Sequence, residues 1–295
     1  MSQNNTRLGI LLMIATTFVF AMQDGISRHL GGTYNVMMVV MIRYWFFAAF
    51  VIVYAARQTG KRGFRATIHT DQLPLQILRG FLLAGEIIVA VLAFVLLGLI
   101  EAHAIFASYP LMVAALAGPV LGEQVGWRRW AAIAVGFIGM MIILRPGAGV
   151  FSPYSMIAVI SALMFAVYGL LTRYVAHKDS AVTSFFWTGV SGCVLATFIG
   201  VWFWEPMARE DWLWMGILCL TGAGGHFLLI KTLEVAEASA VQPFSYFQLV
   251  FVSVIAVLVF GETIEAHVAL GAGIIVVAGL FTFWRERMRA RREAL

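Results

Sequence analysis

The sequence predicts an all-α membrane protein of ten transmembrane helices, arranged as two inverted five-helix repeats. Three observations predict it: an apolar composition, ten apolar stretches of spanning length, and motifs that occur once in each half of the chain. Of the 295 residues, 61% are hydrophobic and 12% are charged, whereas a soluble domain has about 45–50% apolar and about 25% charged residues. So few charges cannot cover a water-exposed surface, which excludes an ordinary soluble domain.

Charged residues, glycines and prolines divide the chain into apolar stretches, and roughly 20 apolar residues suffice to cross a bilayer. The first stretch, from Leu8 to about Leu30, is too long for the core of a signal peptide, so we expect it to be an uncleaved span. The shortest breaks between spans lie near Glu101 and Gly122-Glu123. The expected spans are 8–30, 34–56, 73–97, 102–121, 127–144, 154–175, 180–204, 212–231, 239–260 and 266–284.

Basic residues indicate the orientation, because cytoplasmic loops of membrane proteins are enriched in Lys and Arg. With the N-terminus inside, fifteen of the 20 basic residues fall in cytoplasmic segments. Only Arg28, Arg145 and Arg209 fall outside, while Arg43 and Arg79 lie within spans. This bias predicts that both termini are cytoplasmic, which requires an even number of spans. The basic tail after residue 284 is expected to contact anionic lipid headgroups.

Motifs recur between residues 1–150 and 151–295, which we therefore predict to be two repeats. Each copy holds five spans, an odd number, so the second copy would cross the membrane in the opposite sense. Inverted repeats are typical of secondary transporters, whose substrate site lies near the membrane midplane. A duplication kept for packing alone is the alternative. The matched motifs are Phe20-Ala21 with Phe165-Ala166, Ser27-Arg28 with Thr172-Arg173, Glu101-Ala102-His103-Ala104 with Glu237-Ala238-Ser239-Ala240, and Gly122-Glu123 with Gly261-Glu262.

These motifs, together with glycines in the fifth and tenth spans, resemble the EamA-type ten-helix branch of the drug/metabolite transporter superfamily. The resemblance covers nearly the whole chain, and within the branch the sequence is similar to the YddG-type amino-acid exporters. It implies alternating-access export of amino acids, aromatic ones included, across a bacterial inner membrane. Drugs, nucleotide sugars and other metabolites are the alternative substrates. Phosphorylated ones are disfavoured, because Arg43 is the only clearly central cation.

Two equivalent helix faces are candidates for the lining of a cavity. In the first span Thr16, Phe20, Gln23 and Ser27 share one face, and an offset of 145 residues converts them into Ser161, Phe165, Tyr168 and Thr172. A water-accessible cavity favours such polar and aromatic positions, whereas hydrogen bonding between helices is the alternative explanation. We expect Phe20, Gln23, Phe165 and Tyr168 to contact substrate.

A charge in the membrane interior costs about 2.5–3.5 kcal/mol on insertion scales and should have a partner. We expect Asp24 and Arg43, at similar depths, to form a structural ion pair, with direct substrate binding by Asp24 as the alternative. For Glu86 three roles stay open: binding a substrate ammonium group, carrying a coupling proton, or sharing Arg43. Arg79 lies close enough to a membrane surface to reach water.

His226 follows Gly222, Gly224 and Gly225, which would either let another helix approach closely or loosen the helix beside a cavity. A lone buried histidine is often structural, and substrate binding is the alternative role. Tyr109 precedes Pro110, while Tyr246 and Gln248 follow Pro243. Because proline frees a backbone carbonyl, these positions suit a hinge or a cavity wall. We therefore add Tyr109, His226, Tyr246 and Gln248 to the candidate substrate-binding residues.

Enzymatic activity is not expected. The chain has neither a G-x-x-x-x-G-K-[ST] nucleotide loop nor an H-E-x-x-H metal motif, so we expect no catalytic residue, metal or cofactor. Cys193 and Cys219 both lie in apolar runs and indicate no disulfide framework. The expected partners are an amino-acid substrate and the lipid bilayer, with a proton as candidate coupling ion and no nucleic acid. We expect a monomer or a weak dimer.

Overall fold

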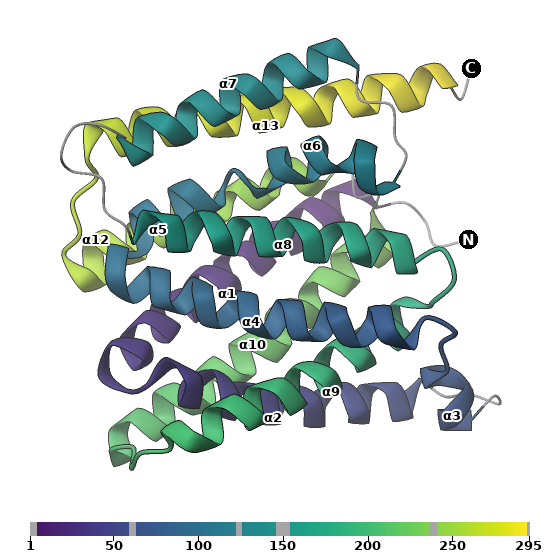
Figure 1. Ribbon diagram of the computed structural model, residues 1–295, viewed down its shortest axis with the longest axis vertical. Helices are drawn as coiled ribbons and strands as arrows, with labels where there is room; N and C mark the ends of the chain where they lie inside the picture. Colours follow the sequence, from purple (N-terminus) through teal and green to yellow (C-terminus); the bar gives the residue numbers. More distant parts are fainter. Residues whose placement is uncertain (1–4, 59–62, 122–125, 146–153, 237–240, 294–295) are drawn as a thin grey trace.

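The computed structural model describes residues 5–58, 63–121, 126–145, 154–236 and 241–293, and these residues form only helices and their connections. Nearly all of these helices pack lengthwise beside one another (Figure 1). The α-helices are α1 (Thr6–Thr33), α2 (Val36–Arg57), α3 (Gly63–Ile68), α4 (Leu73–Leu97), α5 (Leu99–Phe106), α6 (Tyr109–Leu121), α7 (Trp127–Leu144), α8 (Ser155–Val175), α9 (Ala181–Gly200), α10 (Arg209–Val235), α12 (Phe247–Phe260) and α13 (Ala266–Glu293), and the 3-10 helices are η2 (Val201–Phe203) and η3 (Gln242–Tyr246).

Within the described residues, nine helical segments are long and apolar enough to cross a membrane. At the expected fifth span the structure has a shorter apolar helix, Trp130–Leu144, within α7. Two expected spans are interrupted: α5 ends before α6 begins at Tyr109, and the ninth span starts as η3 before α12. Pro110 and Pro243 lie at these interruptions and lack the N–H that would continue a helix from the preceding turn. The motif residues Gly122-Glu123 and 237–240 lie outside the described residues.

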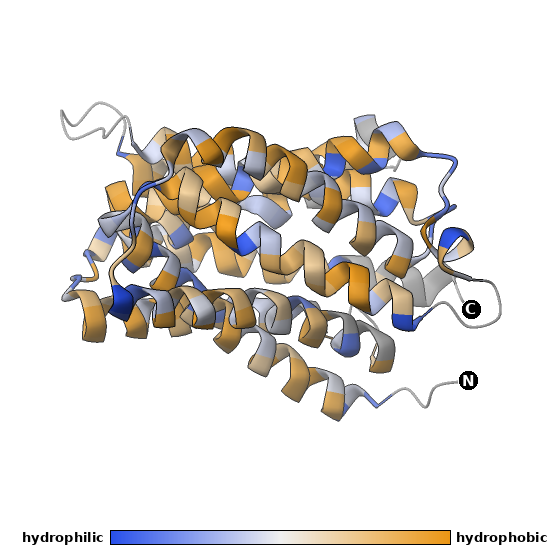
Figure 2. Cartoon of the chain, turned by 90° about the horizontal axis from the view of Figure 1, so that it is seen from below, coloured by the Kyte–Doolittle hydropathy of each residue, from blue (hydrophilic) through white to orange (hydrophobic). Residues whose placement is uncertain are grey.

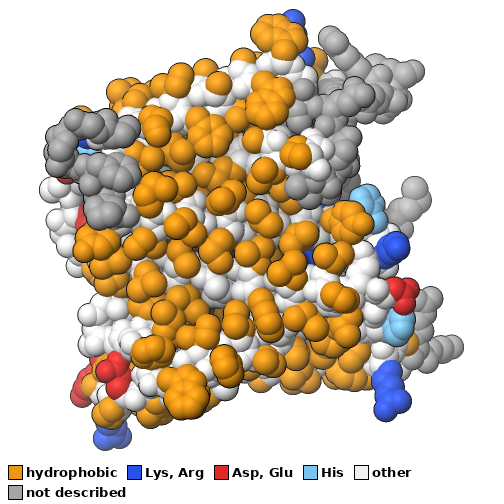
Figure 3. Space-filling view, in the orientation of Figure 1, with side chains coloured by type: hydrophobic (Ala, Val, Ile, Leu, Met, Phe, Trp, Pro, Cys, Tyr) orange, Lys and Arg blue, Asp and Glu red, His pale blue; other side chains and the backbone are white. Residues whose placement is uncertain are grey.

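The surface has the pattern of a protein embedded in a bilayer. Figure 3 shows a broad apolar belt across the visible face, with charged side chains gathered at the two ends of the helices. Figure 2 shows the same trend along the helices, which are mostly apolar between more polar ends. The described start of α1 and the described end of α13 lie at the same end of the molecule (Figure 1).

The two halves of the chain are interleaved. The most extensive helix pairs are α7 with α13, α1 with α10, α2 with α9 and α4 with α8, and each pair joins one helix from residues 1–145 to one from residues 154–293. Figure 1 shows α7 and α13 at one edge of the bundle and α2 and α9 near the opposite edge. The interior lies between these edges, where buried apolar residues of α2, α4, α5 and α8 form one cluster.

The α7–α13 pair depends on two facing glycines. A Cβ atom at Gly139 would lie 2.8 Å from the carbonyl oxygen of Gly271, and a Cβ atom at Gly271 would lie 2.6 Å from the carbonyl oxygen of Gly139. Small residues allow such close backbone approach in membrane helices, where association depends on packing rather than on a hydrophobic driving force. The expected glycine-rich fifth and tenth spans therefore pack against each other at these positions.

The variant Gly139→Leu should push α7 away from α13 and lower stability by about 1–3 kcal/mol, the usual cost of overpacking. The measurement is the thermal unfolding midpoint of the purified protein in detergent. Gly273→Leu is the matched control, because a Cβ atom at Gly273 meets no other atom within 4 Å. Equal midpoints for the two variants would contradict this packing account.

Candidate functional site

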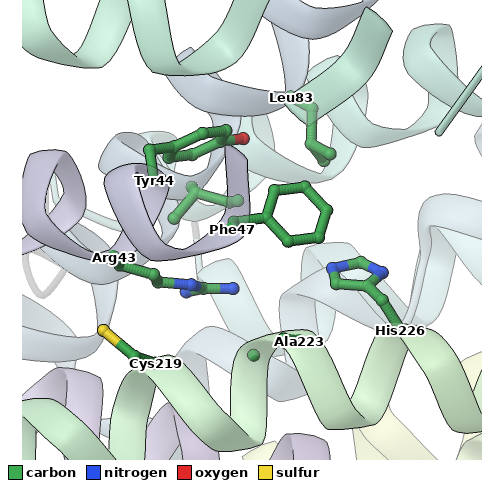
Figure 4. Close-up of a pocket in the computed structure, with 9 residues that line it drawn as sticks. Arg43, Tyr44, Phe47, Leu83, Cys219, Ala223 and His226 are labelled. Carbon is green, nitrogen blue, oxygen red and sulfur yellow. The ribbon is translucent and has the colours of Figure 1, made fainter. Parts of the chain in front are cut away.

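A small pocket, with a cavity volume of about 10 Å³, lies between α2, α4 and α10. Four of its residues, Cys219, Gly222, Ala223 and His226, lie on one face of α10. Figure 4 shows the Arg43 guanidinium and the His226 ring directed toward each other, with the Phe47 ring beside the gap between them. The lining residues are Arg43, Tyr44 and Phe47 of α2, Leu83 and Ile87 of α4, and Cys219, Gly222, Ala223 and His226 of α10.

Arg43 is the charged group of this pocket. Its side chain is buried, with 8% of the residue exposed. It forms no hydrogen bond or ion pair with any residue that the structure describes, although buried cations in proteins are normally paired. A buried guanidinium that faces a pocket in this way is available to an anionic group of a ligand.

Gln23 of α1 lies beside Arg43 above Gly222. A Cβ atom at Gly222 would lie 3.3 Å from Arg43 Nε and 3.4 Å from Gln23 Oε1, so these two groups meet over the same glycine. Gln23 Oε1 is buried and accepts no hydrogen bond from the described residues, while Gln23 Nε2 donates to Asp24 Oδ1 at 3.5 Å. The site thus presents an unpaired donor group and an unpaired acceptor next to each other.

The glycines of α10 allow this approach of α1. A Cβ atom at Gly225 would lie 2.6 Å from the Phe20 ring, and Gly222 faces Gln23 and Arg43. Close approach is therefore the role of these two glycines, whereas a Cβ atom at Gly224 would meet nothing within 4 Å.

Aromatic rings surround His226. Its ring centroid lies 5.3 Å from that of Phe20, 5.4 Å from that of Phe47 and 6.3 Å from that of Phe185. Tyr44 packs on Phe47 at 6.0 Å, and its buried hydroxyl has no partner among the described residues. This wall offers flat apolar surface and one spare hydroxyl beside the guanidinium.

The predicted ion pair between Asp24 and Arg43 is not formed. Asp24 Oδ2 instead accepts a hydrogen bond from Gln248 Nε2 at 2.8 Å and lies 3.1 Å from His103 Nε2. The reason is rotation along α1: consecutive residues of a helix point about 100° apart, so Gln23 faces Arg43 while Asp24 faces α5 and α12. The prediction used only the similar membrane depths of Asp24 and Arg43, which do not show that the Asp24 side chain points away from α2.

Two other ionisable side chains of α4 also have partners. Glu86 Oε1 accepts a hydrogen bond from Ser161 Oγ of α8 at 2.8 Å, so one residue of the second predicted stripe contacts a predicted site residue. Arg79 does not reach water as expected, since 1% of it is exposed. Arg79 donates instead to Gln76 Oε1 and to Thr172 Oγ1 and lies over the Tyr168 ring.

The second predicted stripe forms a different cluster. Phe165 packs on Tyr109 at 4.9 Å and on Tyr168 at 6.0 Å, and Phe106 joins them from α5. The Tyr246 hydroxyl is buried without a hydrogen-bond partner among the described residues. None of these side chains lines the Arg43 pocket. Of the predicted site residues, His226 lines it, and Phe20 and Gln23 contact the lining residues His226 and Gly222 from outside.

Sequence reasoning missed Tyr44, Phe47 and Cys219 as pocket residues. The positions Arg43, Tyr44 and Phe47 lie within one turn of α2, so the aromatic residues next to an intramembrane arginine were the available signal. Cys219 carried no comparable signal, because its role follows from its spacing to Gly222 and His226 on α10.

A carboxylate joins three helices at one end of the bundle. Glu262, just after α12, pairs with Arg28 of α1 and accepts the backbone N–H groups of Leu99 at 2.8 Å and Ile100 at 3.0 Å. It therefore caps the N-terminus of α5, where a negative charge is stabilised. Gly98 precedes this helix with φ +90°, and its absent Cβ leaves room for the Glu262 carboxylate.

Comparison with known proteins places the chain among bacterial transporters. An S-adenosylmethionine uptake transporter of Rickettsia prowazekii (strain Madrid E) is 25% identical over 97% of this chain and 96% of the relative. A riboflavin transporter of Vibrio cholerae serotype O1 is 28% identical over 97% of this chain and 96% of the relative. One solved crystal structure shares the fold, with a TM-score of 0.64 at 17% identity over 97% of this chain and 99% of that one.

The profile of the EamA-like transporter family matches this sequence twice, over residues 7–145 and 153–284. The two matches cover most of both halves, in agreement with the expected superfamily. The chain belongs to the EamA-like transporter family and is a multi-pass membrane transporter of small metabolites.

Proposed function

We propose that this chain transports a small metabolite that has an amino-acid end and a planar ring, and that the Arg43 pocket binds it. The observation that carries the proposal is the pair of unsatisfied groups above Gly222, the Arg43 guanidinium and Gln23 Oε1. An α-amino acid carries its carboxylate and its ammonium group on one carbon. The carboxylate would accept hydrogen bonds from Arg43, whose planar fork matches it, and the ammonium group would donate to Gln23 Oε1.

The aromatic wall supports the second part of the substrate. Phe47 and His226 line the pocket together with Arg43, and Phe20 packs on His226 with the ring centroids 5.3 Å apart. Planar rings bind favourably against such side chains in stacked or edge-to-face arrangements. Glu86, held by Ser161 on the neighbouring helix, is the second candidate partner for a positive group of the substrate.

The names of the relatives select the first substrate to test. S-adenosylmethionine combines a methionine amino-acid end with an adenine ring and so meets both requirements, whereas riboflavin supplies a planar ring system only. Neutral aromatic amino acids, expected from the sequence, also meet both. Four relatives are named for uptake, so export is not supported by those names and flux should be measured in both directions. Phosphorylated substrates are disfavoured, because Arg43 is the one Lys or Arg side chain among the described residues that line the pocket.

Transport would proceed by alternating access between two inverted repeats in a bacterial inner membrane, with both termini cytoplasmic. The interleaved pairs support this arrangement: α1 with α10 and α4 with α8 are the pairs that an exchange of repeats would interconvert. The Glu262–Arg28 contact would close one end of the path and break when that end opens. Because the residues that line the pocket belong to α2, α4 and α10 of one chain, a monomer would be the transporting unit.

The variant Arg43→Gln should slow transport about tenfold or more, since a hydrogen bond to a charged group contributes about 1.5–3 kcal/mol. Arg43→Lys should be intermediate, because it keeps the charge but not the two-pronged geometry. The measurement is exchange of labelled S-adenosylmethionine, riboflavin or phenylalanine into preloaded liposomes. Arg65→Gln, in the exposed helix α3, is the control and should match the wild type. Wild-type exchange by Arg43→Gln, or transport of riboflavin alone, would contradict the proposal.

Cys219 offers a direct measure of occupancy. In a Cys193→Ser background it is the only thiol, and it lines the pocket beside Arg43. S-adenosylmethionine should slow its reaction with N-ethylmaleimide severalfold, because the ligand fills the adjoining space, and Arg43→Gln should remove this protection. A cysteine placed at Gly216 of the same helix, in a background lacking both native thiols, serves as control, since that position contacts nothing within 4 Å. Labelling of Cys219 that ignores the ligand would place the substrate elsewhere.

A further inference from the structure

His103 of α5 lies between two hydrogen-bond acceptors in the protein interior. Its Nδ1 is 3.2 Å from the backbone carbonyl oxygen of Leu99, and its Nε2 is 3.1 Å from Asp24 Oδ2. Both side chains are buried, with 5% of His103 and 8% of Asp24 exposed. Phe94 stacks on the imidazole at 4.8 Å, which excludes water from that side.

This geometry allows the pair to hold one proton or two. A carbonyl oxygen can only accept, so a hydrogen bond from His103 to Leu99 requires a hydrogen on Nδ1. A neutral imidazole has one N–H. If that hydrogen is on Nδ1, the lone pair of Nε2 points at a lone pair of the Asp24 carboxylate, and the two repel each other. An additional proton removes this conflict, either on Nε2 as an imidazolium–carboxylate pair or on Asp24 as a carboxylic acid that donates to Nε2. In both forms the pair has no net charge, which suits its position inside a membrane.

We propose that Asp24 and His103 form a binding site for one transported proton, and that this proton is exchanged for the substrate of the Arg43 pocket. The inference rests on the proposed function for its second half. Loss of the proton leaves the pair with one negative charge. Gln248 Nε2, which donates to Asp24 Oδ2 at 2.8 Å, would stabilise that charged form.

Few other ionisable groups face the pair. On α4, Glu86 is bonded to Ser161 of α8, and on α2, Arg43 faces the pocket. On α10, His226 lies among aromatic rings. At the closed end, Arg28 pairs with Glu262, and His267 of α13 lies 3.1 Å from Glu265. On α5 itself, Glu101 accepts from Ser155 Oγ. Apart from Arg43 and His226, each of these described groups has a hydrogen-bond or ion-pair partner, and that partner is neither Asp24 nor His103.

Gln23 connects the proton site to the substrate pocket. Its Nε2 donates to Asp24 Oδ1 at 3.5 Å, while its Oε1 points toward Gly222 without a partner. A substrate ammonium group bound to Gln23 Oε1 would therefore be separated from Asp24 only by the side-chain amide of Gln23. A net negative charge on the Asp24–His103 pair attracts that ammonium group, and a proton on the pair removes the attraction. Proton and substrate thus oppose each other's binding, which is the condition for antiport.

The test uses the full chain in liposomes with labelled S-adenosylmethionine, and valinomycin with equal potassium on both sides holds the potential at zero. With the interior one pH unit more acidic than the exterior, one-for-one antiport should accumulate the substrate about tenfold. Asp24→Asn and His103→Gln should lose this accumulation, while exchange of internal for external substrate continues. In Asp24→Asn this exchange needs a higher substrate concentration, because the negative charge that attracts the ammonium group is absent. Undiminished accumulation in Asp24→Asn would overturn the proposal. The proposal would also be overturned if the wild type accumulated substrate only with an acidic exterior, or equally well without a pH gradient.

His29→Gln is the matched control, because His29 also pairs with a carboxylate, Asp211 at 3.3 Å, but lies at the partly exposed end of α1. It should accumulate substrate as the wild type does. Wild-type exchange without proton-driven accumulation would leave the proposed function intact and refute the proton site.

A failure of S-adenosylmethionine exchange would instead count against the proposed substrate, and the proton site can then be measured alone. The readout is a pH titration of protein with ¹⁵N-labelled histidine in lipid, with His103 assigned through its absence in His103→Gln. The His103 nitrogen resonances should move between two limits when the pair gains its proton, whether that proton lies on Nε2 or on Asp24 bonded to Nε2, and Asp24→Asn should remove this change. Resonances of His103 that stay constant between about pH 5 and 9 would overturn the proposal.

Discussion

The constraint on which this structure depends is the cost of a charge inside a membrane, which requires each buried ionisable group to find a partner. Asp24 meets it with His103 and Gln248, Glu86 meets it with Ser161, and Arg79 meets it with Gln76 and Thr172. These bonds join α1 to α5 and α12 and join α4 to α8, so they also hold helices from both halves of the chain together. Polar contacts that are worth little in water become positional constraints here, because breaking one leaves an unsatisfied group in a medium of low dielectric constant.

Arg43 departs from this rule, and its departure is the main support for the proposed site. Arg43 is a residue of which 8% is exposed, and its guanidinium has no hydrogen bond or ion pair among the described residues, so it would destabilise the fold unless a ligand or water satisfies it. The neighbouring Gln23 Oε1 and Tyr44 hydroxyl are unsatisfied in the same way. Three spare polar groups around one pocket are more than random packing would leave, since buried polar atoms in proteins are nearly always hydrogen-bonded. The glycines of α10 are part of the same arrangement, because Gly222 and Gly225 leave room for the α1 side chains Gln23 and Phe20 beside the pocket.

The sequence predicted most helices closely and the site only in part, for one physical reason. Apolar length and charge distribution are properties of single helices, so α1, α2, α4, α8 and α9 lie within a few residues of their expected bounds. The kinked spans differ, since Pro110 and Pro243 interrupt hydrogen bonding at points that hydropathy does not reveal. The hydrogen-bond partner of a buried side chain depends on the direction in which it leaves its helix and on which helices lie there. Asp24 and Gln23 are adjacent in sequence, yet Asp24 faces α5 and Gln23 faces Arg43. The repeat match singled out Phe20 and Gln23, which adjoin the pocket residues His226 and Gly222, whereas their equivalents Phe165 and Tyr168 pack in a cluster with Tyr109.

The orientation of a single amide connects the two proposed sites. Gln23 can present its oxygen to the pocket only while its nitrogen faces Asp24, and the observed orientation satisfies both conditions. A rotation of the amide by 180° would place a donor beside the Arg43 guanidinium and an acceptor beside Asp24, an arrangement that repels both neighbours when Asp24 is charged. The charge on Asp24 therefore stabilises the amide orientation that receives an ammonium group. A proton on the Asp24–His103 pair weakens that preference without moving any helix. Local hydrogen bonding alone would then make the affinity for substrate depend on the protonation state, and α5, which carries His103 and is capped by Glu262, would link that state to the closed end of the path.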